Sequence, residues 1–227
     1  GNINFDFAII SNPTFLHEAF ILNLLKMKIP IFIEKPVTYK LDNIDFILKK
    51  VEEINLFTYV GCNLRFHPCI LFIKKKLEEE KPIINECNIY CGSFLPNWRP
   101  DRNYKSFYSV NSSMGGGVHL DLFHEFDYTI WLFGFPLKKH SLLRNVSSLN
   151  IEAIDYANYI FEYQNFTVNI ILNYYRKKSK RSIEIVLDNE TLNIDLINNI
   201  ITNDGGQILI NKDFNQFLGL NHYLLDF

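Results

Sequence analysis

Residues 31–40 read IFIEKPVTYK, so three apolar residues of a short strand run directly into Glu34, Lys35 and Pro36. Four further patterns flank this stretch: strands at 5–10 and 56–61, and amphipathic helices at 14–27 and 41–53. Strands that alternate with helices over short links are typical of a parallel sheet with covering helices. The first third of the chain therefore predicts a parallel α/β unit.

The pattern changes in the rest of the chain. A helix is expected after Pro68 and another at 118–133, and strands are expected at 83–94, 153–162, 167–175, 182–187, 191–195 and 200–202. Consecutive strands without intervening helices are typical of an antiparallel sheet. We therefore expect two domains of class α/β plus α+β. Residues 1–66 form the parallel unit, and residues 67–227 form an α+β domain with a mostly antiparallel open sheet.

The composition excludes several classes of protein. The 227 residues are 48% hydrophobic with a formal net charge of −2, which offers no basic field for nucleic acid. The basic run at 176–181 is expected to be a solvated turn. Four cysteines show neither a CxxC pair nor zinc-type spacing, so no metal is expected. No apolar run reaches the length of about 18 residues that spans a membrane, and we expect a cytoplasmic protein without a membrane partner.

Polar side chains follow the predicted parallel strands where those strands end. Glu34 and Lys35 follow the second strand, and Asn63 and Arg65 follow the third. In open α/β sheets, ligands bind outside the carboxyl ends of the strands. Pro36 restricts the backbone before it, so the direction of Lys35 is fixed. On Glu34, Lys35 and Pro36 alone, a surface Glu-Lys pair at the end of a strand is the preferred interpretation.

A second segment, residues 115–134, reads GGGVHLDLFHEFDYTIWLFG. Glycines let the backbone approach a ligand closely, and the first amides of a helix favour an anion. Asp121, His124 and Asp127 lie at i, i+3 and i+6, so neighbours in this series are expected to share a helix face. Because buried charges require partners, this face indicates a site in preference to packing.

The order and spacing of these motifs resemble the Gfo/Idh/MocA family of NAD(P)-dependent oxidoreductases. The shared motifs are E-K-P after a strand, G-x-N-x-R-x-x-P at 61–68, GGG-x-x-x-D-x-x-H-x-x-D before W-L-F-G, and D-x-A-I-I-S-N-P-T-x-x-H at 6–17. The resemblance implies an N-terminal Rossmann domain and hydride transfer between NAD or NADP and a carbon of a sugar, cyclitol or nucleotide sugar.

The resemblance also implies roles for single residues. Lys35 matches the lysine that binds the reacting hydroxyl, His124 the general acid/base, and Asp121 the acid that orients the substrate or the imidazole. The implied cofactor-binding residues are Asn12, Pro13, His17, Glu34, Lys35, Trp98 and Arg99. The implied substrate-binding residues are Asn63, Arg65, Tyr104 and Asp127. Loop packing is an equal alternative for Trp98 and Arg99, and loop surface is one for Tyr104 and Tyr108.

The sequence departs from the family pattern in three places. Many relatives have D-x-x-x-H where this chain has D-x-x-H, so the roles of Asp121 and Asp127 are interchangeable at this stage. His119 is a second candidate base. No G-x-G-x-x-G occurs anywhere in the chain, which predicts an incomplete Rossmann domain and a fragment of a longer enzyme.

Three functions remain open at this stage. The first is a sugar or nucleotide-sugar dehydrogenase, for which the loop at 97–102 resembles enzymes of surface-polysaccharide synthesis. The second is a silent remnant or interaction module that forms a homo-oligomer through the C-terminal sheet. The third is a relative that uses NAD transiently in glycoside cleavage.

Overall fold

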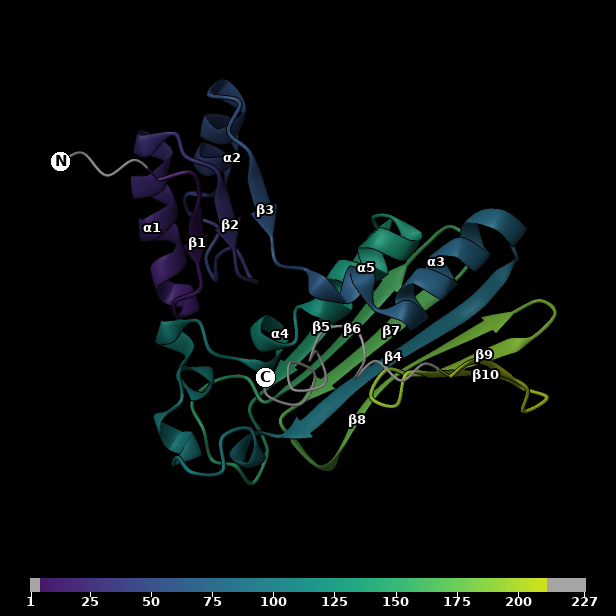
Figure 1. The fold of residues 1–227 in the computed structure, drawn as a ribbon. Coiled ribbons are helices and arrows are strands. Elements are labelled where there is room, and N and C mark those ends of the chain that lie inside the picture. The colour runs from purple at the N-terminus through teal and green to yellow at the C-terminus, as the bar shows by residue number, and fades with distance from the viewer. Residues whose placement is uncertain (1–4, 212–227) are drawn as a thin grey trace.

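The computed structural model describes residues 5–211 and contains two sheets, each with its own helices (Figure 1). The smaller sheet is parallel and has the order β1-β2-β3. Its unit consists of β1 (Ala8–Ile10), α1 (Thr14–Met27), β2 (Ile31–Ile33), α2 (Ile44–Glu53) and β3 (Thr58–Val60). The predicted alternation of strands and helices is therefore confirmed.

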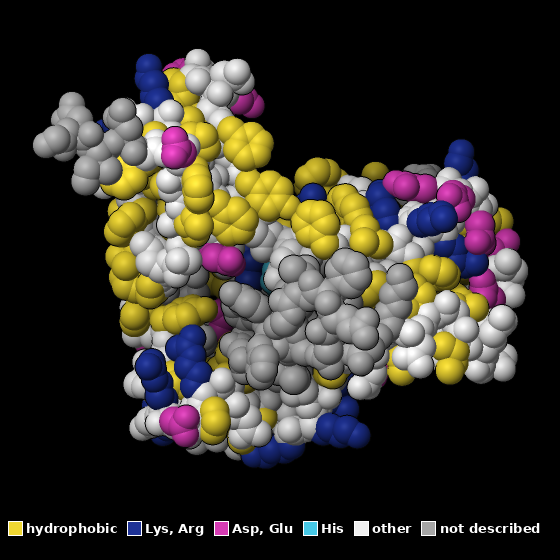
Figure 2. All heavy atoms as spheres, in the orientation of Figure 1, with side chains coloured by type: hydrophobic (Ala, Val, Ile, Leu, Met, Phe, Trp, Pro, Cys, Tyr) yellow, Lys and Arg dark blue, Asp and Glu magenta, His cyan; other side chains and the backbone are white. Residues whose placement is uncertain are grey.

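Helices cover only one face of this small sheet. Ile10, Ile31 and Ile33 pack with side chains of α1 and α2 in one core cluster. On the opposite face, Ile9 pairs in register with Phe32, and Phe32 with Tyr59. Ile9 is 59% exposed and Tyr59 40% exposed, and hydrophobic side chains are visible over the surface of this unit (Figure 2). Since parallel sheets are normally buried on both faces, this apolar face is suited to a further covering element.

The larger sheet has eight strands in the order β11-β10-β9-β8-β4-β7-β6-β5. Its strands are β4 (Ile84–Phe94), β5 (Lys138–Arg144), β6 (Tyr156–Glu162), β7 (Thr167–Asn173), β8 (Tyr175–Leu187), β9 (Thr191–Asp195), β10 (Ile200–Asn203) and β11 (Ile208–Asn211). Neighbouring strands are antiparallel except for the parallel pair of β4 and β7. This arrangement confirms the mostly antiparallel C-terminal sheet.

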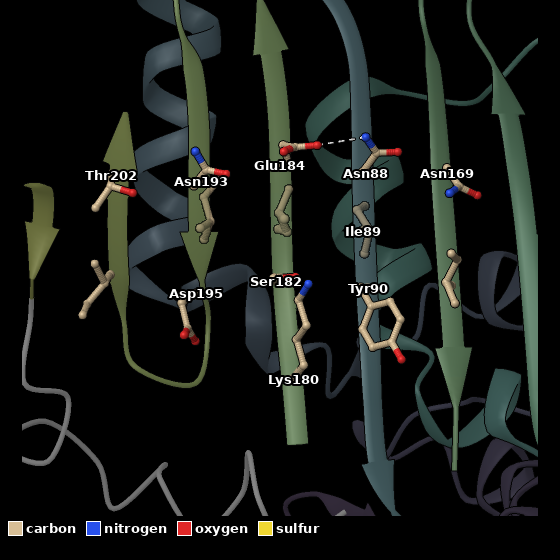
Figure 3. A pocket seen from close by; sticks show the side chains of 14 residues that line it. Asn88, Ile89, Tyr90, Asn169, Lys180, Ser182, Glu184, Asn193, Asp195 and Thr202 are labelled. Carbon is tan, nitrogen blue, oxygen red and sulfur yellow. Dashed lines mark hydrogen bonds between the residues drawn. The ribbon is translucent and has the colours of Figure 1, made fainter. Parts of the chain in front are cut away.

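Two helices, α3 (Pro68–Glu80) and α5 (His124–Phe133), lie across one face of the larger sheet (Figure 1). Ile70 and Ile73 of α3 and Tyr128 of α5 belong to the same core cluster as Ile89 and Ile183 of the sheet. Proline begins α3, where its missing N–H costs no helical hydrogen bond. The other face of the sheet is lined by mixed polar and apolar side chains, including Asn88, Tyr90, Glu184 and Asn193 (Figure 3).

Two local predictions are wrong. The basic run at 176–181 is part of β8 and not a turn, and its last residue, Arg181, is buried. The helix expected at 118–133 is divided into α4 (Val118–Asp121) and α5, with Leu122 and Phe123 between them. Asp121 therefore ends one helix and His124 begins the next, so they do not share the face of one continuous helix.

A long segment links β4 to α4 and contains only short 3₁₀ turns, η2 (Leu95–Asn97), η3 (Tyr104–Ser106), η4 (Tyr108–Val110) and η5 (Ser112–Met114), while η1 (Asn63–Phe66) precedes α3. All four cysteines are buried and free. Over residues 5–211, no helix is long and apolar enough to cross a bilayer, and no group of side chains has the make-up of a metal site. The proposed boundary at residue 66 stays a prediction.

Candidate active site between the two sheets

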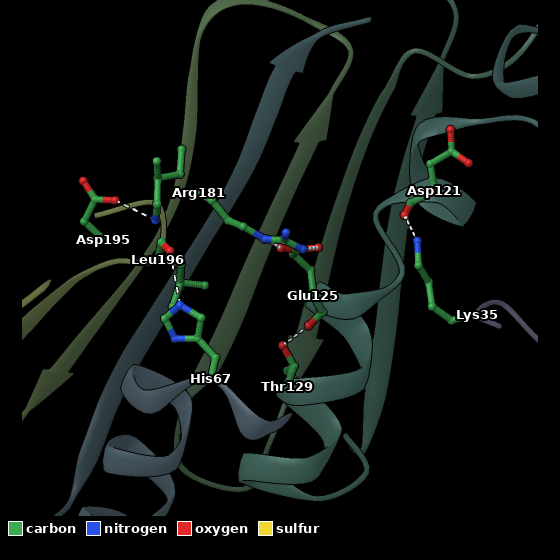
Figure 4. Close-up of polar contacts among 9 residues, drawn as sticks. Lys35, His67, Asp121, Glu125, Thr129, Arg181, Asp195 and Leu196 are labelled. Carbon is green, nitrogen blue, oxygen red and sulfur yellow. Dashed lines mark hydrogen bonds and ion pairs between the residues drawn. The ribbon is translucent and has the colours of Figure 1, made fainter. Parts of the chain in front are cut away.

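Lys35 joins the two sheets. It follows β2 directly, is only 8% exposed, and its Nζ donates a hydrogen bond of 2.7 Å to the main-chain carbonyl of Asp121 (Figure 4). The peptide bond between Lys35 and Pro36 is cis. Burial lowers the pKa of the Lys35 ammonium, and the nearby Asp121 carboxylate opposes this effect. The lysine of the EKP motif is thus held at the end of α4.

The carboxylate of Asp121 points away from Lys35 (Figure 4). Its Oδ2 accepts a 2.5 Å hydrogen bond from the hydroxyl of Tyr174, which is fully buried. Burial raises the pKa of Tyr108, and the charge of Asp121 raises it further, so a second tyrosine lies near the same carboxylate. Tyr174 therefore holds the carboxylate of Asp121, which was expected to orient the substrate or the imidazole. The main-chain carbonyl of Asp121 contacts Lys35.

His124 begins α5 and is buried. Burial lowers the pKa of its imidazole well below the usual value, and the positive charges of Lys35 and Arg181 lower it further. Within residues 5–211, its Nδ1 has no hydrogen-bond partner. A neutral imidazole carries one N–H and one free lone pair, so the ring is able to accept a proton.

A cavity of about 360 Å³ lies at the carboxyl ends of β1 and β2. It is lined by Ser11, Asn12, Pro13, Thr14, His17, Glu34, Lys35, Arg99 and Tyr108. The structure thus brings together six of the seven residues expected to bind the cofactor, although they come from three separate segments. Oδ1 of Asn12 is buried and has no partner among the described residues, so it is available to accept a hydrogen bond from a ligand amide.

His17 connects the two turns that form this cavity. Its Nδ1 lies 3.0 Å from the carbonyl oxygen of Pro36, and its Nε2 lies 2.8 Å from that of Asn12. The ring is 1% exposed. His17 therefore fixes the turn after β1 against the turn after β2, in addition to lining the cavity.

Trp98 and Tyr104 pack within the long loop and do not line the cavity. Trp98 donates from Nε1 to the hydroxyl of Ser93 over 2.8 Å and contacts Tyr174 edge to face, with 5.4 Å between ring centroids. The hydroxyl of Tyr104 donates to the carbonyl of Leu149 over 3.0 Å. Both side chains anchor the long loop, which was the alternative interpretation for Trp98.

Two of the three remaining predicted substrate residues, Arg65 and Asp127, form an ion pair. Arg65 donates from Nε and Nη2 to the carboxylate of Asp127 over 2.9 and 2.5 Å. Asp127 is therefore committed to Arg65, and the exchange of roles with Asp121 is not supported. Asn63 precedes this pair, and its Oδ1 is buried without a partner among residues 5–211.

The glycine run has a packing role that the sequence did not reveal. A Cβ on Gly116 would lie 2.6 Å from the carbonyl oxygen of Asn111, and the N–H of Gly116 donates to this same carbonyl over 2.9 Å. The N–H of Val118 donates to the carbonyl of Ile154 over 2.9 Å. Within the described residues these groups contact the protein itself, so the expected anion site at this helix is not supported. His119 is partly buried and does not line the cavity.

A buried ion pair lies beside His124 and was not predicted. Arg181 of β8 donates from Nε and Nη2 to the two carboxylate oxygens of Glu125 over 2.7 and 3.0 Å (Figure 4). Glu125 is fully buried and Arg181 is 7% exposed. Glu125 directly follows His124 in the sequence, which could have indicated one member of the pair. Arg181 lies in a basic run, and nothing in the sequence distinguishes it from its neighbours.

Comparisons with known proteins show which family the first part of the chain resembles. Residues 2–62 match the model of the GFO_IDH_MocA oxidoreductase family, described as an NAD-binding Rossmann fold. The uncharacterized oxidoreductase YrbE of Bacillus subtilis (strain 168) is 28% identical over 173 residues, which are 74% of this chain and 48% of YrbE. The 2,7-anhydro-N-acetylneuraminate hydratase of Mediterraneibacter gnavus is 21% identical over 127 residues, which are 56% of this chain and 33% of that enzyme.

Solved structures share the fold. WlbA dehydrogenase from Bordetella pertussis, in complex with NADH and UDP-GlcNAcA, has a TM-score of 0.77 at 15% identity, over 97% of this chain and 64% of its own. An inositol dehydrogenase homolog from Azotobacter vinelandii, in complex with NAD+, has a TM-score of 0.78 at 14% identity, over 97% of this chain and 60% of its own. The chain spans half or less of the curated relatives that it matches. Residues 2–62 thus resemble the Gfo/Idh/MocA family of oxidoreductases, and the chain shares the fold of these solved structures.

Proposed function

We propose that this protein is an NAD-dependent oxidoreductase that transfers a hydride between the nicotinamide ring and a carbinol carbon of a sugar or nucleotide sugar. The observation that carries this proposal is the position of Lys35, which lines the cavity after β1 and β2, contacts Asp121, and lies close enough to His124 to lower the pKa of its imidazole. Oδ1 of Asn12, which has no partner among the described residues, and the polar lining of that cavity fit the amide-bearing end of the cofactor. When bound, NAD supplies the hydride acceptor.

The chain's own residues supply the proton chemistry. A carbinol carbon loses hydride only as its hydroxyl loses a proton, and the neutral His124 imidazole is the group that takes this proton. The ammonium of Lys35 stabilises the negative charge that develops on the same oxygen. The carbonyl of Asp121 holds this ammonium in place, since Nζ donates to it over 2.7 Å.

Lys35→Ala and His124→Ala in the full-length protein test this proposal. Each variant should reduce hydride transfer by about 10²- to 10⁴-fold and largely retain NADH affinity, because neither group is the main attachment of the cofactor. Lys40→Ala is the matched control, since Lys40 is an exposed lysine close by in sequence. Near-parental turnover in both site variants would refute the proposal.

A second candidate is NAD-assisted glycoside cleavage. In such a reaction NAD takes a hydride from the substrate and returns it before the product leaves, so NAD is not consumed. The match to a hydratase in Mediterraneibacter gnavus supports this alternative. Product analysis separates the two functions, because a dehydrogenase accumulates NADH stoichiometrically with product, whereas the second reaction leaves NAD unchanged. A chain that binds neither NADH nor NADPH in calorimetry, although folded, would favour a silent module.

We also propose self-association through the open face of the larger sheet. The half-buried Ile171 and Ile200 lie on this face among Asn88, Tyr90 and Glu184, and this mixture suits a partner of similar pattern (Figure 3). Light scattering should detect a dimer or a larger assembly. Tyr90→Glu is the test substitution, because it places a charge on this face, and a monomer in the unsubstituted protein would contradict this proposal.

A further inference from the structure

Tyr174 is a fully buried tyrosine whose hydroxyl contacts the site indirectly. It lies between β7 and β8 and donates to Oδ2 of Asp121 over 2.5 Å. The main-chain carbonyl of the same aspartate accepts the hydrogen bond from Lys35. One residue thus receives a tyrosine at its side chain and the lysine at its main chain.

The end of α4 makes this tyrosine contact important. The helix has only four residues and ends at Asp121, and Leu122 leaves helical geometry with φ −94° and ψ 42°. The carbonyl that meets Lys35 is therefore not held by a continuing helix. Its direction depends on how the side chain of Asp121 is fixed.

Tyr174 is itself held firmly. Its N–H donates to the carbonyl of Asp155 over 3.1 Å, and its carbonyl accepts from the N–H of Leu95 over 2.8 Å. Its ring contacts Trp98 edge to face. The long loop, through Trp98, and the large sheet thus both support the hydroxyl that reaches Asp121.

We propose that Tyr174 is a positioning residue that fixes Asp121, and through its carbonyl fixes Lys35, for the reaction. This inference rests on the proposed function for its kinetic consequence. Its structural part does not, because the arrangement of Lys35 can be measured without turnover. Tyr174 does not line the cavity, so it is not itself a catalytic residue.

Tyr174→Phe in the full-length protein is the test, since it removes only the hydroxyl. The matched control is Tyr128→Phe, because Tyr128 is equally buried and its hydroxyl has no partner among residues 5–211. Tyr174→Phe should lower kcat by about 10-fold or more with little change in KM, because a lysine displaced by about 1 Å loses its alignment. Tyr128→Phe should leave both constants unchanged.

A second measurement is independent of activity. Brief acetylation with acetic anhydride, followed by peptide mass spectrometry, reports how readily Lys35 reacts relative to the exposed Lys40. The reactivity ratio should rise severalfold in Tyr174→Phe and stay at the parental value in Tyr128→Phe. If the wild-type protein transfers no hydride but the ratio changes as described, the proposed function fails and the positioning role stands. An unchanged ratio and kcat in Tyr174→Phe, or equal effects of both substitutions, would overturn the inference.

Discussion

Glu125→Gln should strongly destabilise the larger unit. The substitution keeps the shape of the side chain and removes the charge that neutralises Arg181, and both groups are at least 93% removed from solvent. Breaking a buried ion pair by removing one partner costs about 3 to 5 kcal/mol, because the other charge stays buried without compensation. The two hydrogen bonds of 2.7 and 3.0 Å show that Arg181 and Glu125 are in direct contact. We therefore expect the loss in the free energy of unfolding to fall within this range.

Urea unfolding followed by tryptophan fluorescence measures this effect. Both tryptophans of the chain, Trp98 and Trp131, pack against the core of the larger unit and report on it directly. With a slope of about 1 to 3 kcal/mol per molar urea, the midpoint should fall by at least about 1 M. Glu79→Gln is the control, because the Lys75–Glu79 pair is exposed with 3.9 Å between its charges, and it should change the free energy of unfolding by less than about 1 kcal/mol.

The double variant Glu125→Gln/Arg181→Met distinguishes pairing from packing. Removing both charges should recover part of the lost free energy of unfolding, since no uncompensated charge is left. A loss below about 1 kcal/mol in Glu125→Gln, or a double variant whose cost is the sum of the single costs, would refute the reasoning.

Three further predictions concern stability. Burial lowers the pKa of His67 to about 4 in the folded protein, whereas the unfolded value is near 6.5, so its contribution is complete above pH 6.5 and is lost as the pH falls toward 4. The free energy of unfolding should therefore fall by about 3 kcal/mol over this window, and His67→Gln should reduce the slope; equal slopes would contradict the assignment. Gly116→Ala should cost about 1 to 3 kcal/mol in the same urea assay, because the new Cβ overlaps the Asn111 carbonyl, and Gly205→Ala, with more space around it, is the comparison. Asp127→Asn should cost about 1 to 2 kcal/mol, because Arg65 is partly exposed and can be rehydrated, and a loss above about 4 kcal/mol would show a more buried role for the pair.

Local patterns predicted the part of the site that depends on sheet geometry. Lys35 was expected at the carboxyl end of a parallel strand, and the structure places it there, at the junction with α4. Asn12, His17 and Glu34 were expected near it, and they line one cavity. The placement of Glu34 and Lys35 follows from the alternation of strands and helices, whereas the roles of Asn12 and His17 were implied by the resemblance to the family.

Features that depend on distant contacts could not be predicted. Apolar residues continue the helical spacing through Leu122 and Phe123, so nothing local marks the break between α4 and α5. Arg181 resembles its exposed neighbours in a basic run, and its partner Glu125 lies 56 residues earlier. Strand β5, at the edge of the larger sheet, was not predicted from the sequence. All of its residues are exposed, so polar and apolar side chains do not alternate along it.

The crystal structure of the full-length protein with NADH would test the central claim most directly. Our account predicts that the nicotinamide ring occupies the cavity lined by Asn12, Glu34 and Tyr108, with Lys35 and His124 at the face where the substrate carbon must lie. NADH bound with its ring outside this cavity, or a folded full-length protein that binds no NADH, would contradict it.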